Sequence, residues 1–250
     1  MSCLSWNCLG LGNPGAVREL CNVVKQEGPE LVFVMETKIR GRQVEDLRHT
    51  LGFVGSFLVD SDGLTCGVGL FWSKEVDVEL KSYGKSHIDV LVQDGVPGSN
   101  AWRLTGFYGA PRAADRHYSW RFLRTLHAIP HAAWMCIGDF NETLYQDEQF
   151  SRSARPERQM REFREATSEC ALQDLGWTGV AYSWDNRQLG DANVKARIDG
   201  AFSNEEFKQR YDRTRVRHVF AVESDHCFVI PEFRNHTFTQ RTIGAKQFRY

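Results

Sequence analysis

The stretch AWMCIGDFNETL, Ala133–Leu144, joins an apolar run to an abrupt polar end. Its first half is apolar and rich in residues that favour β-structure, which predicts a strand buried in a sheet. The run then stops on Asp139 and Asn141. Because Asp and Asn bond their own backbone and leave extended structure readily, turn chemistry alone explains one such strand end. A functional interpretation therefore depends on what the other predicted strands carry at their ends.

The composition is that of a globular protein with a core of its own. The chain has 250 residues, of which 42% are hydrophobic and 12% aromatic. It has no apolar run near the ~18 residues that cross a bilayer and no signal-peptide pattern at its N-terminus, so we expect an intracellular protein without a membrane partner. The seven cysteines are odd in number and include no C-x-x-C pair, which indicates neither a disulfide framework nor a zinc site.

The net charge of −1 argues against coating nucleic acid by bulk electrostatics. It leaves open a protein that binds a few phosphates through a metal and local Arg or Lys side chains, because the field depends on arrangement as well as total charge.

Helices and strands alternate along the chain in a pattern typical of an α/β protein. A helix is predicted from Pro14, with Asn13 as its N-cap, and shorter helical patterns follow near residues 44–51, 120–126 and 160–170. Between 67 and 108 the period changes to two, which predicts successive antiparallel strands linked by hairpins. Without linkers or repeats, we expect one continuous domain in which two β-sheets pack face to face with helices outside.

The predicted strands share polar ends. The runs CLSWN, LVFVME, LTGFY, WMCIGDFN, ARID and FAVESDH end on the following residues: Asn7, Glu36, Tyr108, Asp139 with Asn141, Asp199, and Ser224 with Asp225 and His226. If these ends meet at one rim, they form a site of carboxylates, amides, a tyrosine and a histidine. Such oxygen-rich groups suit Mg²⁺ and in-line hydrolysis of a phosphoester.

Seven motifs in order make the interpretation specific: SWNCLGLG, METK, GFYGAP, GDFNE, YSW, RIDGAF and SDHC. Together they resemble the endonuclease/exonuclease/phosphatase superfamily, and in detail the apurinic-type endonuclease domain of plant LINE (non-LTR) retrotransposon polyproteins. The resemblance implies a DNase I-like four-layer sandwich over residues 1–250. It also implies Mg²⁺ as the cofactor, with Mn²⁺ able to substitute.

The resemblance assigns roles residue by residue. Glu36 matches the principal metal-binding glutamate, Asn7 the asparagine that supports the metal and phosphate site, and Asp225 a residue beside a second metal position. The remaining matches are catalytic: Tyr108 contacts the scissile phosphate, Asp139 orients or deprotonates water, Asn141 holds phosphate and water in line, His226 stabilises the transition state, and Asp199 pairs with His226.

A second group of residues is expected to contact substrate. Ser183 and Trp184 have sheet packing as their alternative role. The loop DNRQLGDANV, residues 185–194, matches the hairpin with which LINE endonucleases probe the DNA groove. Arg187, Lys195 and Arg197 are then candidate phosphate contacts, against the alternative of a solvated hairpin tip.

These matches imply a DNA endonuclease that leaves a 3′-hydroxyl and a 5′-phosphate. Its expected partner is double-stranded DNA, its expected state a monomer and its expected location the nucleus. The chain ends at KQFRY without a YADD-like polymerase signature, so we expect a C-terminus truncated before a linker and a reverse transcriptase. Two alternatives remain: a superfamily phosphatase or RNA nuclease, and a non-catalytic DNA-binding relic.

Overall fold

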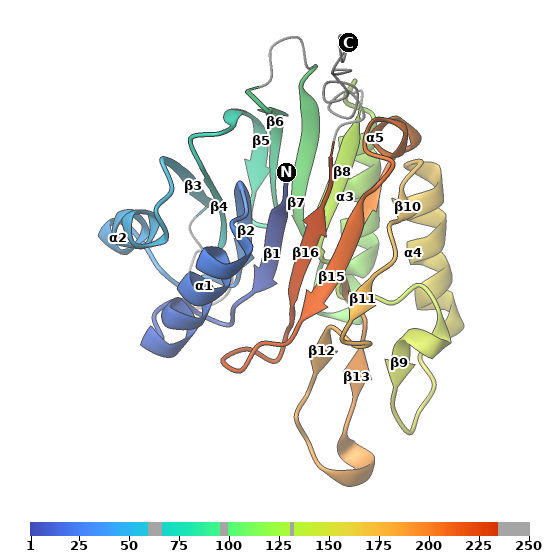
Figure 1. Ribbon diagram of the computed structural model, residues 1–250. Coiled ribbons are helices and arrows are strands. Elements are labelled where there is room, and N and C mark those ends of the chain that lie inside the picture. Colours follow the sequence, from blue (N-terminus) through green and yellow to red (C-terminus); the bar gives the residue numbers. More distant parts are fainter. Residues whose placement is uncertain (60–66, 96–99, 131–132, 235–250) are drawn as a thin grey trace, which may run out of the picture.

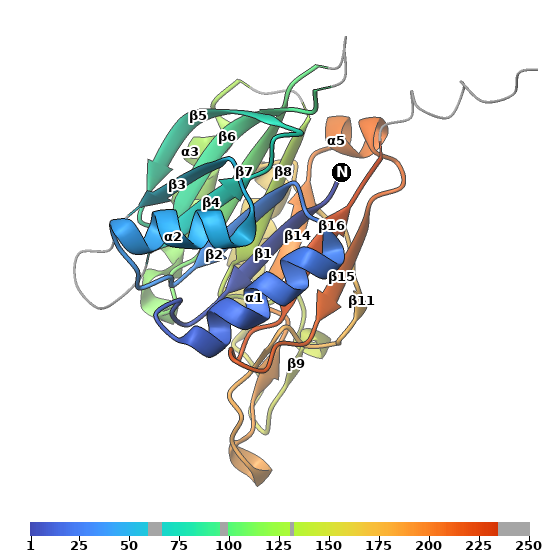
Figure 2. The same ribbon diagram turned by 60° about the vertical axis from the view of Figure 1, so that its left-hand side comes forward.

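The fold is a sandwich of four layers, two β-sheets enclosed by helices (Figures 1 and 2). The computed structural model describes residues 1–59, 67–95, 100–130 and 133–234. The α/β class and the two-sheet sandwich predicted from the sequence are confirmed. Cys66 and the C-terminal segment 235–250, which ends in KQFRY, lie outside the described residues.

The first sheet has seven strands in the order β11-β15-β16-β1-β2-β4-β3. Within it β1 and β2 run parallel, whereas β1 and β16 run antiparallel. The strands are β1 (Cys3–Asn7), β2 (Leu31–Met35), β3 (Gly55–Val59), β4 (Val68–Trp72), β11 (Thr178–Gly179), β15 (Arg215–Val219) and β16 (Phe228–Glu232).

The second sheet has six strands in the order β10-β14-β8-β7-β6-β5. Here β7 and β8 are parallel and β14 is antiparallel to β8. The strands are β5 (Asp77–Gly84), β6 (His87–Gln93), β7 (Trp102–Tyr108), β8 (Trp134–Asp139), β10 (Gln173–Asp174) and β14 (Asp199–Ser203).

Helices cover the outer face of each sheet. Apolar side chains of α1 (Pro14–Glu27) and α2 (Arg42–Leu51) pack on the seven-stranded sheet, and those of α3 (Arg116–His127) and α4 (Glu157–Glu169) pack on the six-stranded one. A short α5 (Glu205–Arg210) packs on β8. Helix α1 begins as predicted, because Asn13 accepts a hydrogen bond from the N–H of Gly15 and Pro14 occupies the first turn.

Strand alternation explains how both faces of each sheet are buried. In β2, Leu31, Phe33 and Met35 enter the core between the sheets, while Val32 and Val34 face the helices. Successive side chains of a strand point to opposite faces, so a continuous apolar run is required when both faces are covered. The apolar run ahead of Asp139 follows the same rule.

Two sequence expectations about strand pairing are wrong. The first expected hairpin does not form, because β4 lies in the seven-stranded sheet and β5, β6 and β7 in the other. The segment VKARIDGAF, whose apolar residues predict a single strand, is two strands, β13 (Lys195–Ala196) and β14, since the chain passes between sheets at Arg197 and Ile198. Hydrophobic periodicity identifies strands but does not determine which strands pair with each other.

A small third sheet projects from the sandwich. It has the order β12-β13-β9, formed by β12 (Trp184–Asp185), β13 and β9 (Gln149–Phe150). The hairpin of β12 and β13 extends from the lower end of the molecule in Figure 1. Among the described residues, no helix is long and apolar enough to cross a membrane.

Candidate active site

The predicted polar residues meet at one rim of the sandwich, in the space between the two sheets. Asp139 lies on the same face of its strand as Met135 and Ile137, and Asn7 lies on the same face of its strand as Cys3. The side chains of Met135, Ile137 and Cys3 are in the central core. Because side chains two apart share a face, both polar groups point inward where that core ends. The sequence pattern thus places one group from each sheet face to face.

Strand register aligns the groups of the six-stranded sheet. Asp139 is opposite Tyr108 on one side and Asp199 on the other. Asp199 begins its strand rather than ending it, and His226 precedes β16, so the expectation that both end strands is wrong. The residues still share the rim, because an antiparallel strand starts where its neighbour stops.

Several residues at the rim have a left-handed backbone. The φ angles of Leu9, Glu36, Lys38 and Asn141 lie between 52° and 57°. A positive φ is uncommon for residues other than glycine, and it persists only where the surroundings hold it. Here it turns the chain sharply after β1, β2 and β8, beside the side chains that form the site.

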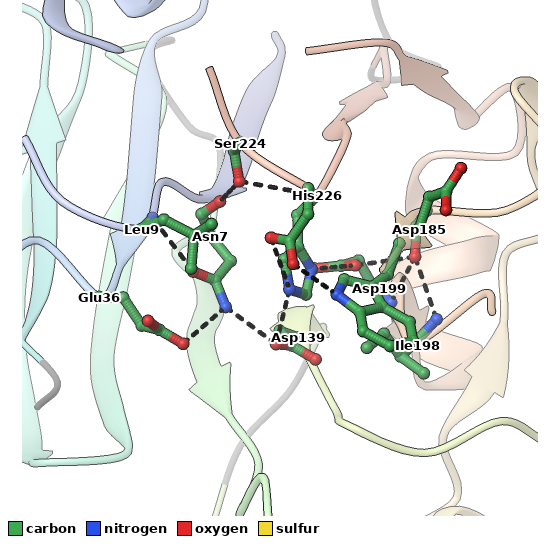
Figure 3. Close-up of polar contacts among 12 residues, drawn as sticks. Asn7, Leu9, Glu36, Asp139, Asp185, Ile198, Asp199, Ser224 and His226 are labelled. Atoms are coloured by element: carbon green, nitrogen blue, oxygen red, sulfur yellow. Dashed lines mark hydrogen bonds and ion pairs between the residues drawn. The ribbon is translucent and has the colours of Figure 1, made fainter. Parts of the chain in front are cut away.

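Asn7 bridges two carboxylates from different sheets. Its Nδ2 donates to Glu36 Oε1 at 3.2 Å and to Asp139 Oδ2 at 3.1 Å (Figure 3). The hydroxyl of Tyr108 donates to Glu36 Oε1 at 2.8 Å. Asn141 completes this half of the site, donating from its backbone N–H and from Nδ2 to Asp139 at 2.8 and 3.2 Å.

His226 forms the second half of the site with Asp199 and Ser183. Its Nδ1 lies 2.9 Å from Asp199 Oδ2, and the Ser183 hydroxyl donates to the same oxygen at 2.7 Å. The other ring nitrogen, Nε2, is 3.9 Å from Asp139 Oδ2 and 3.8 Å from Asp225 Oδ1, both beyond hydrogen-bond length. That N–H is therefore directed into the site and available to a substrate oxygen.

The buried charges shift each other's pKa. Burial and the nearby carboxylate of Asp199 raise the pKa of Asp139 to about 7. Burial alone would lower the pKa of His226, but Asp199 and Asp139 outweigh it and raise that pKa to about 10. At neutral pH the site therefore holds an imidazolium beside a carboxylate that can exchange a proton.

The remaining predicted substrate residues occupy different positions. Trp184 Nε1 donates to Asp225 Oδ2 at 2.8 Å, so this indole fixes an acidic group of the site. Lys195 is partly exposed and lies 3.1 Å from Asp185. Arg197 is buried and paired with Glu148 and Asp174, so its guanidinium lies within the protein rather than on a surface that faces DNA.

Two contacts around His226 were not expected from the sequence. The Ser224 hydroxyl donates to the carbonyl of Asn7 at 2.6 Å and accepts the His226 N–H at 3.1 Å. Trp6 Nε1 donates to the His226 carbonyl at 3.2 Å. The Ser224–Asn7 and Trp6–His226 hydrogen bonds each join residues more than 200 positions apart in the sequence, and only the adjacency of β1 and β16 brings them together.

The donor set fits a hard cation. Asp139, Asp199 and His226 offer ligand atoms within 4.8 Å of one another, but Asp199 already accepts from His226 and Ser183. Glu36 is more accessible, with 20% of its side chain exposed, and Asp225 Oδ1 is a buried oxygen that has no hydrogen-bond partner within the described part of the chain. Carboxylate oxygens are preferred by Mg²⁺, whereas imidazole favours transition metals.

Comparison with known proteins agrees with this geometry. The profile of the Endonuclease/Exonuclease/phosphatase family matches residues 4–226. The chain belongs to this family. Members of the family are generally metal-dependent enzymes that hydrolyse phosphoester bonds. A search of curated protein sequences found no match.

Several solved structures with a similar fold align with almost the whole chain. The endonuclease domain of TRAS1, a telomere-specific non-LTR retrotransposon, is 14% identical with a TM-score of 0.67 and covers 94% of this chain and 99% of its own. The AP endonuclease LMAP from Leishmania major is 16% identical with a TM-score of 0.67, covering 94% and 87%. The 3′ phosphatase NExo from Neisseria, bound to product DNA hairpin, is 18% identical with a TM-score of 0.64, covering 94% and 99%. At these identities the likeness shows the fold.

Proposed function

We propose that the protein is a Mg²⁺-dependent DNA endonuclease that leaves a 3′-hydroxyl and a 5′-phosphate. The observation that carries the proposal is the meeting of Glu36 and Asn7 from one sheet with Asp139 and the His226–Asp199 pair at one rim. This arrangement matches the motif roles implied by the family. Two of the structural neighbours are named as endonucleases and one is bound to a DNA hairpin, which supports DNA as the substrate.

Glu36 and Asp225 are the residues we assign to Mg²⁺, which supplies charge neutralisation at the phosphate when bound. Asn7 donates from its amide nitrogen to both the Glu36 and Asp139 carboxylates, so it holds the two groups close together. Ligation through its Oδ1 requires the amide to turn over. Tyr108 holds Glu36 through its hydroxyl and lies at the same edge. Mn²⁺ is expected to replace Mg²⁺, since both accept oxygen ligands.

The proton chemistry is assigned to the buried groups. Asp139, whose pKa is raised to about 7, accepts a proton from the attacking water. Asn141 orients its carboxylate through two hydrogen bonds. The protonated His226 donates from Nε2 to a phosphate oxygen, and Asp199 keeps the ring in this orientation through Nδ1.

The first test is nicking of supercoiled plasmid. Purified protein should convert it to open circles with Mg²⁺ and not with EDTA, and ligation should reseal the nick because it carries a 3′-hydroxyl and a 5′-phosphate. Asp139→Asn, Glu36→Gln and His226→Ala should each lose at least ~100-fold in rate, in keeping with loss of a general base or a charge-stabilising donor.

Asp147→Asn is the matched control, since Asp147 is an exposed carboxylate in the short 3-10 helix Gln146–Glu148 that follows Asn141. It should nick as the wild type does. Full activity in the Glu36 or His226 variant would refute the assignment. Release of phosphate from a 3′-phosphorylated oligonucleotide, without nicking, would favour the phosphatase alternative, and cleavage of RNA alone would favour an RNA nuclease. Salt-sensitive DNA binding without hydrolysis of any of these would favour the relic.

The biological context that we propose for the nicking activity is retrotransposition. We extend the proposal to target-site nicking for a LINE retrotransposon, in the nucleus, by a monomer that acts with a reverse transcriptase module. The motifs support this setting, and so does the similarity to the endonuclease domain of the retrotransposon TRAS1. A 3′-hydroxyl at the nick is the primer that such a module extends.

A further inference from the structure

The loop that carries Asp225 and His226 is hydrogen-bonded to the hairpin of β12 and β13. The Asp185 N–H donates to the Asp225 carbonyl at 3.0 Å, and the Cys227 N–H donates to the Ser183 carbonyl at 2.7 Å. Trp184 and His226 form an isolated antiparallel bridge. The base of the hairpin is therefore an extra strand beside the catalytic histidine.

Arg187 adds a second connection further along the same hairpin. Its guanidinium donates to the carbonyls of Val222 at 3.0 Å, Ala221 at 3.2 Å and Ser224. All three acceptors belong to the loop between β15 and β16, the loop of Asp225 and His226. A guanidinium offers five donors in a fixed fork, which suits several carbonyls of one turn.

The opposite side of the same loop is held by α1. Glu19 accepts the N–H of Val222 at 2.7 Å and that of Glu223 at 2.9 Å. The loop thus lies between a carboxylate that binds its N–H groups and a guanidinium that binds its carbonyls. Phe220 and Val222 are 63% and 65% exposed, and Ala221 between them packs into the core. The polar clamp therefore adds to the burial of one small side chain in holding the approach to the catalytic histidine.

The backbone of Arg187 is itself held in place. Its φ of 55° is left-handed, a conformation that costs an arginine free energy. Asp185 Oδ1 accepts the Arg187 N–H at 2.8 Å and also binds Asn193 Nδ2 at 2.8 Å across the hairpin. This network sets the direction in which the arginine leaves the hairpin, toward the loop.

We propose that Arg187 is a positioning residue that couples the hairpin to His226, rather than a phosphate contact. The inference rests on the proposed endonuclease function. The hairpin is the element that we expect to meet DNA, so its engagement with the duplex is transmitted to the catalytic histidine through the three carbonyls that Arg187 binds. Arg187 thereby determines the rate of cleavage more than the affinity for DNA.

The decisive variant is Arg187→Asn, because asparagine tolerates the left-handed backbone while removing every guanidinium donor. We expect kcat for nicking to fall by about 10- to 100-fold, the range for losing a group that orients a catalytic one. KM, and DNA affinity measured in an Asp139→Asn background, should change by less than about twofold, and the salt dependence of binding should stay the same. Arg187→Lys should recover part of kcat.

Arg152→Asn is the matched control for charge. Arg152 is 76% exposed and pairs with Asp191 of the hairpin, away from the catalytic loop. Its loss should leave kcat unchanged. Hydrogen exchange of amides 221–227 should accelerate in Arg187→Asn and not in Arg152→Asn, a readout that needs no activity.

Two results would overturn the inference. One is an unchanged kcat or unchanged exchange in Arg187→Asn. The other is a loss of affinity with a salt slope smaller by about one, the signature of a lost phosphate contact. If the wild-type chain hydrolyses nothing, the proposed function fails, and the exchange experiment still decides whether Arg187 holds the loop.

Discussion

At the scale of the residue, Ser183 carries more of the site than its motif indicates. Sheet packing and substrate contact were its two expected roles. In the structure its buried hydroxyl donates to Asp199 at 2.7 Å and accepts the N–H groups of Ile198 and Asp199 at 3.0 and 2.9 Å. One side chain therefore satisfies two backbone donors and holds the carboxylate that orients His226.

Replacing Ser183 with alanine should affect stability and catalysis together. The change leaves two buried N–H groups and one carboxylate oxygen short of a partner, which costs about 1–3 kcal/mol of unfolding free energy. Urea unfolding measures the loss, and nicking should slow because Asp199 is less constrained. Ser5→Ala is the control: Ser5 is equally buried but its hydroxyl has no partner among the described residues, so its loss should be neutral. Equal effects of the two substitutions would contradict this assignment.

Sequence reasoning located the residues at strand ends but not their supports. Asp139 and Asn141 could be identified because an apolar run stops on them, and Glu36 because METK follows a similar run. Hydrogen bonds such as Ser224 to Asn7 join segments 217 residues apart, and no local pattern records such a pairing. The motifs likewise offered Arg197 as a phosphate contact, whereas its guanidinium is buried against Glu148 and Asp174, because a sequence shows a charge without showing its partner.

At the scale of the element, the chain between β13 and β14 is held by a buried ion cluster. Arg197 contacts Glu148, beside β9, and lies 2.7 Å from Asp174 of β10, with its guanidinium 4.1 Å from the Trp177 ring centre. Three short elements that lack a core of their own are tied together in this way. The expected single strand VKARIDGAF divides here because Arg197 and Ile198 turn inward between two sheets.

Arg197→Met and Lys195→Met separate structural from DNA-binding cations on this element. Arg197→Met leaves two acidic groups without their cation, so we expect a loss of about 3–5 kcal/mol in unfolding free energy. Lys195→Met removes a partly exposed pair and should cost less than about 1 kcal/mol. If Lys195 contacts phosphate, its variant lowers the salt slope of DNA binding by about one, whereas Arg197→Met leaves that slope unchanged. A reduced slope for Arg197→Met at a temperature where it is folded would place that residue on the DNA surface.

At the scale of the whole molecule, the site exists only because two sheets stop at the same level. Strand periods and helix caps in the sequence were enough to predict the layers, and the cap of α1 at Asn13 agrees in detail. The assignment of β4 to the other sheet was not predictable, because the same alternation suits either partner. The carboxylates of the site come from both sheets, so its chemistry requires the whole domain to be folded.

The pH dependence of global stability has one contribution far from the rim. His87 begins β6, and its ring lies 4.5 Å from that of Phe122 in α3. Burial lowers the pKa of His87 to about 4, and Arg103 adds to this while Asp89 opposes it. The unfolded chain, with a histidine pKa near 6.5, therefore binds one proton more than the folded chain between pH 6.5 and 4.

It follows that His87 stabilises the fold fully above pH 6.5 and progressively less as the pH falls toward 4. His87→Gln removes this proton uptake, so the unfolding free energy of the variant should decline less steeply in that window. Carboxylates that titrate in the same range act in both proteins and cancel in the difference between the two curves. Urea unfolding at half-unit steps from pH 7.5 to 4 measures that difference. If the two curves run parallel, the histidine is protonated in the folded protein as readily as in the unfolded chain, and the packing of β6 against α3 admits a charge.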